Sequence, residues 1–311
     1  MLDVRRLRVL REVASRGSFS AAADALHFTQ SAVSQQIAAL EREAGTTLVE
    51  RNARGVRLTE AGEVLVRHTD VILARLADAE AELEALSGLR GGRLRLAAFP
   101  SAGSSIAPTA IARFRERHPS VDLTMVPAEP PEGQEKLRAG EVDIALLIEV
   151  PWGECFVDST LERQHLLDDP MYVCVPREHK RAGKAKLRME DLSGESWLLG
   201  TGGACPDASI FLRACERAGF EPKIAFRSDD YAAIQGFVAA GLGVALIPEL
   251  AMTNLREDVV VRSLAPRAPV RRIVAATLAG GYRSAAAAAM LDILIEVGQE
   301  YAGGRKLAVV A

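Results

Sequence analysis

The sequence predicts an α/β protein with a small helical N-terminal module, one long helix and a larger C-terminal region of alternating strands and helices. Three observations predict this organisation. Residues 17–43 have the pattern of two short helices joined by a tight turn. Apolar residues then recur at steps of three and four as far as residue 86. From residue 93 onward, short apolar runs alternate with helical patterns, which is typical of strands packed against helices.

Composition allows two or three domains in 311 residues, 49% of which are hydrophobic. The whole chain carries a formal charge of -3, but the charge is unevenly distributed. Residues 1–58 contain nine Arg, no Lys and six acidic residues, whereas residues 59–90 contain three Arg and seven acidic residues. A basic N-terminal segment on an acidic protein is typical of a small nucleic-acid-binding module joined to another domain.

Several function classes are not indicated by the sequence. The N-terminal segment MLDVRRLRVLREV is charged and amphipathic, unlike a secretory signal, and no apolar run is long enough to span a membrane. The four Cys lack CxxC spacing, and the five His form no ligand pair, so no metal or cofactor is expected. Nucleophile-elbow, Walker, HExxH and Rossmann motifs are missing. We therefore expect a cytoplasmic protein that is not an enzyme and has no membrane partner.

The first helix is expected over residues 3–14, with Leu7, Leu10 and Ala14 on one face. Gly17 ends it, and Ser18 can cap the second helix by accepting hydrogen bonds from free N–H groups. His27 and Phe28 form the following turn. Thr29 then caps the third helix, and its hydroxyl is also suited to contact a phosphate.

The third helix has one apolar face and one face of short neutral polar side chains. Val33, Ile37 and Leu40 fall at helical spacing and are expected to pack inward. The opposite face carries Gln30, Ser31, Ser34 and Gln35. Such neutral donors and acceptors let a backbone approach a partner closely, as a recognition helix does in the DNA major groove. The alternative is an ordinary solvent-exposed face.

After Gly45, the segment TTLVERNARGVRLTEAG predicts a two-stranded wing with its turn at residues 52–55. Arg51, Arg54 and Arg57 lie around that turn, where they can contact phosphates or enter the minor groove. A solvated loop would explain these arginines equally well in isolation. Their position next to a neutral helix face favours DNA binding.

A long helix is expected from a cap at Thr59 to about residue 86, with acidic residues in its first turn. Its apolar residues form a heptad seam, which predicts a dimerising coiled coil, although the stripe could instead pack on the chain's own C-terminal region. The seam consists of Leu65, Thr69, Ile72, Leu76, Ala79, Leu83 and Leu86. The sequence SGLRGG at 87–92 then predicts a hinge.

The C-terminal region is predicted to be an α/β sandwich with parallel sheets. Strands are expected at 93–99, 121–127, 142–148, 171–176, 196–200 and 223–227, and within 240–249. Helices are expected within 100–118 and at 132–139, 207–218, 230–240 and 284–300. The predicted division of the chain is 1–58, 59–90 and 91–303.

The N-terminal motifs resemble those of LysR-type transcriptional regulators. The resemblance lies in GSF at 17–19, AA at 21–22, Leu26, TQSAVSQQI at 29–37, LE at 40–41, Gly45, Leu48, Arg51 and LTEAG at 58–62. One departure is Val49, where the family usually has an aromatic residue. The resemblance implies a winged helix-turn-helix that binds double-stranded DNA as a dimer. It places Gln30, Ser31, Ser34 and Gln35 against bases, and Thr29 and the wing arginines against the backbone.

The same resemblance implies a two-lobed effector domain like that of periplasmic-binding proteins. Its chain would cross between lobes near 162–168 and 265–269, giving lobe I at about 91–163 and 268–303, and lobe II at about 164–267. It also implies a homodimer through the linker helix, a homotetramer, and contact with RNA polymerase. A small-molecule effector between the lobes would shift the angle between the paired DNA-binding modules.

Ligands in such folds sit where strands end and helices begin. Pro100, Ser101 and Ala102 open a helix after the first strand, and Thr201, Gly202 and Gly203 occupy the equivalent place in the second lobe. Both segments offer backbone N–H groups and a hydroxyl, which are suited to bind an anion. The alternative is that these groups only cap the helices. We expect Glu149 to reach the same cleft. Asp229 and Asp230 are expected either to add to it or to cap the following helix. Family members that bind carboxylates have a basic group near Glu149, so an acid there favours a ligand with an amino or other donor group.

A thiol-based redox switch is the alternative to an effector. Cys205 and Cys215 are ten residues apart, in roughly the region where the peroxide-sensing branch of the family has two Cys. Cys205 is predicted at a helix N-terminus, which lowers a thiol pKa. The flanking residues differ from those of the peroxide sensors, and Cys215 suits a buried packing position. A third class, a solute-binding transport component, is opposed by the N-terminal DNA-binding motifs.

Overall fold

The computed structural model describes residues 1–52, 55–86, 92–150, 159–200, 206–280 and 283–304. The chain divides into two compact units, Met1–Arg90 with Arg138–Glu141, and Gly91–Leu137 with Val142–Ala311. They are called the N-terminal unit and the C-terminal unit below. Within the described residues, no helix combines the length and apolar character needed to cross a membrane.

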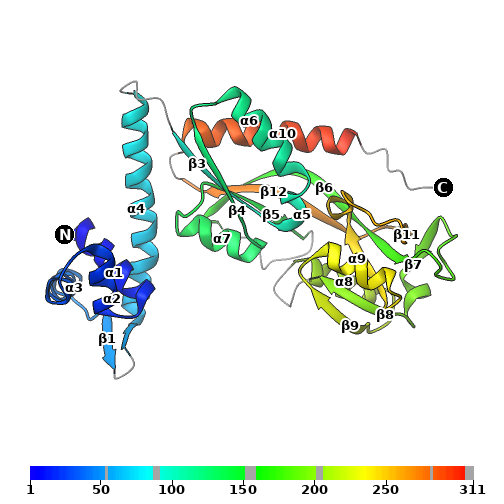
Figure 1. The fold of residues 1–311 in the computed structure, drawn as a ribbon, viewed down its shortest axis with the longest axis horizontal. Helices are drawn as coiled ribbons and strands as arrows, with labels where there is room; N and C mark the ends of the chain where they lie inside the picture. The colour runs from blue at the N-terminus through cyan, green and yellow to red at the C-terminus, as the bar shows by residue number, and fades with distance from the viewer. Residues whose placement is uncertain (53–54, 87–91, 151–158, 201–205, 281–282, 305–311) are drawn as a thin grey trace. The chain divides into compact units, whose positions relative to one another are not determined.

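The N-terminal unit begins with three short helices, α1 (Val4–Arg16), α2 (Phe19–Leu26) and α3 (Gln30–Ala44), shown in blue in Figure 1. The predicted ends of these helices are confirmed. Gly17 is left-handed at φ 61° and ends α1, and the Ser18 hydroxyl accepts from the Ala21 N–H at 3.4 Å. His27 is also left-handed, and the Thr29 hydroxyl accepts from the Ala32 N–H at 3.2 Å. Local polar groups therefore set the helix-turn-helix geometry.

The core of this unit is formed where α1 and α3 pack on each other and on α2. Leu7 and Leu10 of α1 are buried there, as are Val33, Ile37 and Leu40 of α3. The inward face predicted for α3 is therefore confirmed. Ala14 is only partly buried, and the more apolar Val13 takes the core position one residue earlier.

The wing consists of antiparallel strands β1 (Val49–Asn52) and β2 (Gly55–Leu58). The Glu41 carboxylate of α3 accepts from the N–H groups of Leu48 at 2.8 Å and Val49 at 3.3 Å. The Val56 N–H donates to the Gly17 carbonyl at 2.9 Å. These bonds fix the wing against the third helix and the first turn.

Helix α4 (Glu60–Leu86) follows directly from the wing. The Thr59 hydroxyl accepts from the Gly62 N–H at 3.1 Å, as predicted for the cap, and donates to the Thr47 carbonyl at 2.8 Å. A Cβ atom on Gly62 would lie 2.1 Å from the Leu48 carbonyl oxygen. The close approach of α4 to the wing therefore requires glycine at this position.

The predicted seam of α4 is buried at Thr69 and exposed further along the helix. Thr69 is buried, and its hydroxyl donates to the Leu65 carbonyl at 2.7 Å. Further along, Ile72, Leu76 and Leu83 are exposed by 39%, 40% and 67%. The side chain of Leu86 lies outside the described residues. The distal seam is thus an exposed apolar stripe on a long helix, which normally requires a partner.

The C-terminal unit is built on one ten-stranded sheet of order β4-β3-β5-β12-β6-β10-β8-β9, with β11 and β7 attached through β6. Its strands are β3 (Arg93–Ala98), β4 (Asp122–Pro127), β5 (Ile144–Glu149), β6 (Leu161–Pro176), β7 (Lys186–Arg188), β8 (Ser196–Gly200), β9 (Lys223–Ser228), β10 (Val244–Pro248), β11 (Val259–Ala265) and β12 (Val270–Leu278). The sheet is mixed, so the prediction of parallel sheets is wrong. Strand β12 is antiparallel to both β5 and β6, and β10 is antiparallel to β6.

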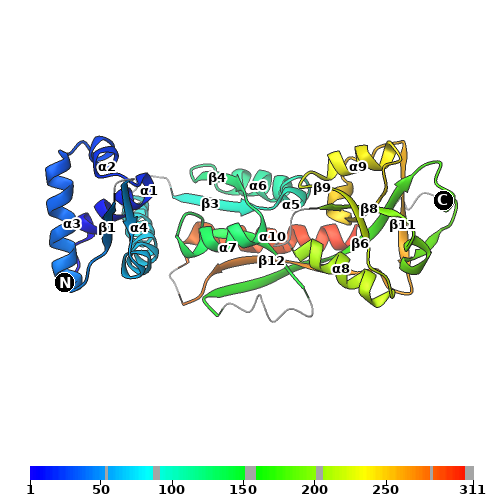
Figure 2. The same cartoon turned by 90° about the horizontal axis from the view of Figure 1, so that it is seen from below.

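Strand β6 joins the two lobes of this unit (Figures 1 and 2). It pairs with β12 as far as Pro170 and with β10 from Met171. The chain therefore changes lobe at 170/171, beyond the predicted segment 162–168. Lobe I is defined here by β3, β4, β5, β12 and residues 161–170 of β6. Lobe II comprises residues 171–176 of β6 together with β7–β11.

Helices cover both faces of the sheet in each lobe. They are α5 (Pro100–Gly103), α6 (Ile106–Arg117), α7 (Pro130–Arg138), α8 (Pro206–Arg217), α9 (Tyr231–Ala239) and α10 (Ala285–Gly303). In lobe I, α6 and α10 share one core with β3, β5 and β12, whereas α7 packs on the opposite face. In lobe II, α8 and α9 occupy opposite faces of the sheet in the same way. Helices α5, α8 and α9 each begin near the junction of the lobes.

We predict that Gly62→Ala destabilises the N-terminal unit by about 1–3 kcal/mol, because the added methyl meets a backbone carbonyl that cannot rotate away. Differential scanning calorimetry of the full chain measures this as a lower melting temperature for that unit. Gly236→Ala in α9 is the control, since an added methyl there meets nothing within 4 Å. Equal melting of Gly62→Ala and the wild type would contradict the close approach.

Candidate functional site

The first candidate site is the exposed start of α3 together with the wing. Gln30, Ser31 and Gln35 are exposed, and Ser34 is partly buried. The Thr29 hydroxyl lies 3.0 Å from the Ser31 hydroxyl as well as capping the helix. The structure therefore brings these five predicted residues together on one turn and a half of helix. Short neutral groups on an exposed helix start can approach base edges.

Two neighbours of this surface on α3 bond to Arg6 of α1. The Gln36 side chain accepts from Arg6 Nε at 3.2 Å, and Arg6 also pairs with the Glu43 carboxylate. Short neutral polar side chains are exposed at the start of α3. Of the wing arginines, Arg57 on β2 is exposed, the side chain of Arg51 on β1 lies outside the described residues, and so does all of Arg54.

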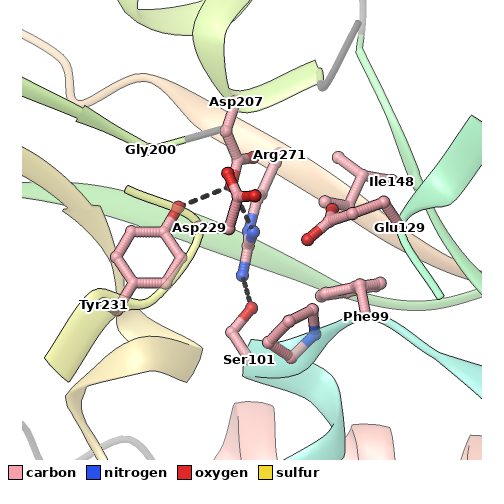
Figure 3. A pocket seen from close by; sticks show the side chains of 10 residues that line it. Phe99, Ser101, Glu129, Ile148, Gly200, Asp207, Asp229, Tyr231 and Arg271 are labelled. Carbon is pink, nitrogen blue, oxygen red and sulfur yellow. Dashed lines mark hydrogen bonds and ion pairs between the residues drawn. The ribbon is translucent and has the colours of Figure 1, made fainter. Parts of the chain in front are cut away.

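The second candidate site is a pocket at the junction of the two lobes of the C-terminal unit (Figure 3). Its space between atoms is about 280 Å³ when open solvent at the mouth is included, and its enclosed part has room for about one water-sized group. Its walls come from the ends of β3, β5 and β8, from the starts of α5, α8 and α9, and from β12. The lining residues are Phe99, Pro100, Ser101, Glu129, Ile148, Gly200, Asp207, Asp229, Tyr231 and Arg271.

Three of the predicted effector contacts, Pro100, Ser101 and Asp229, line this pocket. Ala102 is buried in the core of lobe I instead. Thr201, Gly202 and Gly203 lie outside the described residues, directly after Gly200, which lines the pocket.

Glu149 is not brought to the pocket. Its carboxylate lies 3.3 Å from Arg163 Nε. The physical reason is the alternation of side chains along β5, which turns Ile148 into the pocket and its neighbour to the other face. The acidic character predicted from Glu149 nevertheless recurs in other residues, since Glu129, Asp207 and Asp229 all line the pocket.

The centre of the pocket is Arg271, which is only 1% exposed. Its Nε donates to Asp169 Oδ2 at 2.7 Å, its Nη1 to Asp207 Oδ2 at 2.8 Å, and its Nη2 to the Ser101 hydroxyl at 2.6 Å. The guanidinium carbon also lies 5.2 Å from the centre of the Phe99 ring. Tyr231 completes the cluster by donating its hydroxyl to Asp207 Oδ2 at 2.6 Å.

These partners belong to different parts of the C-terminal unit. Ser101 is in α5 of lobe I, whereas Asp207 and Tyr231 begin α8 and α9 in lobe II. Asp169 is the register partner of Arg271 on β6, immediately before the strand changes lobe, and it also accepts from the Leu250 N–H at 3.2 Å. One buried guanidinium therefore connects both lobes and the strand between them.

The charge state of this cluster follows from its surroundings. Burial by itself would lower the pKa of Arg271, but the carboxylates of Asp207 and Asp169 raise it above its ordinary value, so the guanidinium stays charged. Burial raises the pKa of Asp169, and the charge and hydrogen bond of Arg271 oppose that shift.

Sequence reasoning missed Arg271, Asp169, Asp207 and Tyr231. A signal was present in VRRIVAATL, where two arginines interrupt an apolar run. The strand alternation makes one of them inward-facing, and an inward arginine requires carboxylate partners. Those partners come from segments far away in the sequence, which single-sequence patterns do not bring together.

The thiols of the redox alternative fall partly outside the described residues. Cys205 is not described. Cys215 is fully buried in lobe II beside Trp197 and Phe211, and burial raises the pKa of its thiol to about 12. A thiol so protonated is a poor nucleophile at neutral pH. Among the described residues, no group of three or more His, Cys, Asp or Glu is arranged to hold a metal ion.

Comparison with known proteins gives the family of this chain. Residues 4–63 match the family described as bacterial regulatory helix-turn-helix protein, lysR family, and residues 87–299 match the LysR substrate binding domain. The chain belongs to the LysR family. Relatives include the probable HTH-type transcriptional regulator LrrA of Synechococcus elongatus, which is 33% identical over 96% of this chain and 98% of that protein.

Solved structures of LysR-family regulators have the same fold. A full-length OxyR variant from Pseudomonas aeruginosa is 25% identical, covers 95% of this chain and 98% of its own, and gives a TM-score of 0.73. Full-length CbnR in complex with its target DNA is 21% identical, covers 96% and 99%, and gives a TM-score of 0.68. This LysR-family chain is a DNA-binding transcriptional regulator with a substrate-binding domain.

We predict that Arg271→Met lowers the free energy of unfolding of the C-terminal unit by about 3–5 kcal/mol, because it leaves two buried carboxylates without their cation. Urea unfolding followed by circular dichroism measures the loss. Arg272→Met is the matched control, because its guanidinium is half exposed and 3.8 Å from Asp168. We expect it to cost no more than about 1 kcal/mol. Equal effects of the two substitutions would contradict the role of Arg271.

Proposed function

We propose that this regulator changes its promoter binding when a small-molecule effector enters the pocket between the lobes of the C-terminal unit. The observation that supports this most directly is the Arg271 cluster. It connects both lobes at the wall of an open pocket, so a ligand that contacts residues of both lobes beside the cluster has different affinities for different lobe arrangements. Such differential affinity is what allows a ligand to shift a conformational equilibrium.

In this proposal Gln30, Ser31, Ser34 and Gln35 read base edges in the major groove, while Thr29, Arg51, Arg54 and Arg57 contact the DNA backbone. Pro100, Ser101 and Asp229 contact the effector, together with Glu129, Asp207 and Tyr231. Thr201, Gly202 and Gly203 adjoin Gly200 in sequence and remain proposed effector contacts. Ala102 and Glu149 are left out, because the former is in the core and the latter faces away.

The exposed distal stripe of α4 supports a homodimer through this helix. Two linked recognition helices bind two half-sites with a higher combined affinity than either alone. We retain the division into a DNA-binding module (1–58), a linker helix (59–90) and an effector domain (91–303). We further propose that dimers associate into tetramers, that the protein contacts RNA polymerase in the cytoplasm, and that it acts by binding and allostery without catalysis.

We expect Gln35→Ala to weaken binding to operator DNA by about 1–3 kcal/mol while leaving binding to random DNA nearly unchanged, since a base contact is lost. The operator is first obtained by selecting bound duplexes from a random library with the full-length protein. Fluorescence anisotropy then gives both affinities at one fixed salt concentration. Gln36→Ala is the control, because this neighbour bonds to Arg6. Unchanged discrimination in Gln35→Ala would rule out base reading by this residue.

We expect Leu76→Glu to shift the protein toward monomers in sedimentation velocity and to lower its affinity for the selected DNA, because it places a charge in the apolar seam. Arg67→Glu, on the opposite face of the helix, is the control and should remain dimeric. If the Leu76→Glu variant is still a dimer, the dimer interface is not formed by the seam of α4.

A further inference from the structure

We infer that the effector is a small cation, a primary ammonium or guanidinium compound, held by Glu129, Asp207 and Asp229 above Arg271. This inference rests on the proposed function, because it assigns a ligand class to the proposed effector pocket. Its starting point is the number of carboxylates that line the pocket, together with one carboxylate oxygen there that has no hydrogen-bond partner among the described residues.

The pocket has more negative than positive charge. Glu129, Asp207 and Asp229 line it, and among the described lining residues Arg271 is the one cationic residue. Asp169 lies directly behind Arg271 and adds a further carboxylate. The five groups therefore sum to a formal charge of about -3 when ionised. A second cation reduces this excess, whereas an anionic ligand increases it.

One carboxylate oxygen is buried without a partner. Asp207 is 6% exposed, and its Oδ2 accepts from both Arg271 and Tyr231. Its Oδ1 is buried and has no hydrogen-bond partner among the described residues. A buried charged oxygen left unpaired costs more than an ordinary unmade hydrogen bond, so it is expected to accept from a bound donor. A carboxylate ligand has no proton to donate to this oxygen.

The cation already present does not attract an anion. Three of the five N–H groups of Arg271 donate to protein oxygens, and the carboxylates of Asp169 and Asp207 already balance its charge. An incoming carboxylate would therefore meet a neutralised guanidinium beside further carboxylates that repel it. A cation that donates to Oδ1 of Asp207 adds a partner to this oxygen and keeps the bonds that Arg271 makes.

The dimensions and walls of the pocket limit the cation. The enclosed part of the pocket has room for about one water-sized group, and the rest of its space opens to solvent. A single small group such as an ammonium therefore fits between the walls, while the rest of the ligand lies at the mouth. Asp229 is exposed near the mouth, and the Tyr231 ring stands on the lobe II side (Figure 3). An ammonium or guanidinium group can lie between these residues, with carboxylates on two sides and an aromatic face nearby.

The test is isothermal titration of the full-length protein with methylguanidinium, putrescine and ethylammonium as chlorides, and with sodium acetate and sodium succinate at equal ionic strength. We expect at least one cation to bind and neither carboxylate. We expect Asp229→Asn, an exposed substitution that spares the core, to weaken cation binding about tenfold. Asp122→Asn removes the same charge from the exposed strand β4 and should bind like the wild type.

Binding of a carboxylate in preference to every cation would overturn the inference and leave the effector pocket in place. Cation binding that is equally strong in Asp229→Asn and the wild type would also overturn it, since the site would then lie elsewhere. Absence of binding by all five compounds would overturn the assigned ligand class. Operator binding, measured on the same preparations with and without each compound, reports separately on the proposed function. A bound compound that leaves operator affinity unchanged would count against that function alone.

Discussion

The C-terminal unit depends on the desolvation of one charge. Placing the Arg271 guanidinium in the interior requires at least one carboxylate, and the structure supplies two, from a neighbouring strand and from the start of a helix in the other lobe. Breaking such a buried pair costs much more than an exposed pair contributes. The arrangement therefore determines geometry more than it adds stability. It fixes which residues of lobe I and lobe II face each other, and it leaves Asp207 with one oxygen for a ligand.

The N-terminal unit is organised by different interactions. Its helix-turn-helix is set by local hydrogen bonds at helix ends, and its wing is held by Glu41 and by the close approach at Gly62. Glu43 near the end of α3 pairs with Arg6 of α1, and short neutral polar side chains are exposed at the start of α3. A rigid frame with short exposed polar groups is well suited to reading DNA, because little conformational entropy is lost on binding. The C-terminal unit, in contrast, contains the Arg271 cluster, which lies where the two lobes meet beside the pocket.

Much of the N-terminal unit could be predicted from sequence, because Gly17, Ser18 and Thr29 act on their own neighbours in the chain. The same holds for most strands and helices of the C-terminal unit, whose apolar runs are continuous. Strand β12 and the first half of β6 were missed, since charged residues interrupt them and their pairing is long-range. Ser101 and Asp229 were predicted in the pocket because they follow strand ends. Arg271 was not, because its partners are separated from it by 64 to 170 residues of sequence.

The central claim is that Arg271 couples the two lobes, and a double-mutant cycle tests it most directly. Ser101→Ala removes a lobe I partner, and Tyr231→Phe removes a hydroxyl of lobe II that donates to Asp207, the carboxylate bonded to Arg271. The free energy of unfolding of the C-terminal unit is measured for both single variants, the double variant and the wild type. Coupling through the guanidinium predicts an interaction energy above about 0.5 kcal/mol. Effects that add to within about 0.3 kcal/mol would show that the two lobes contact Arg271 independently, and would contradict the account.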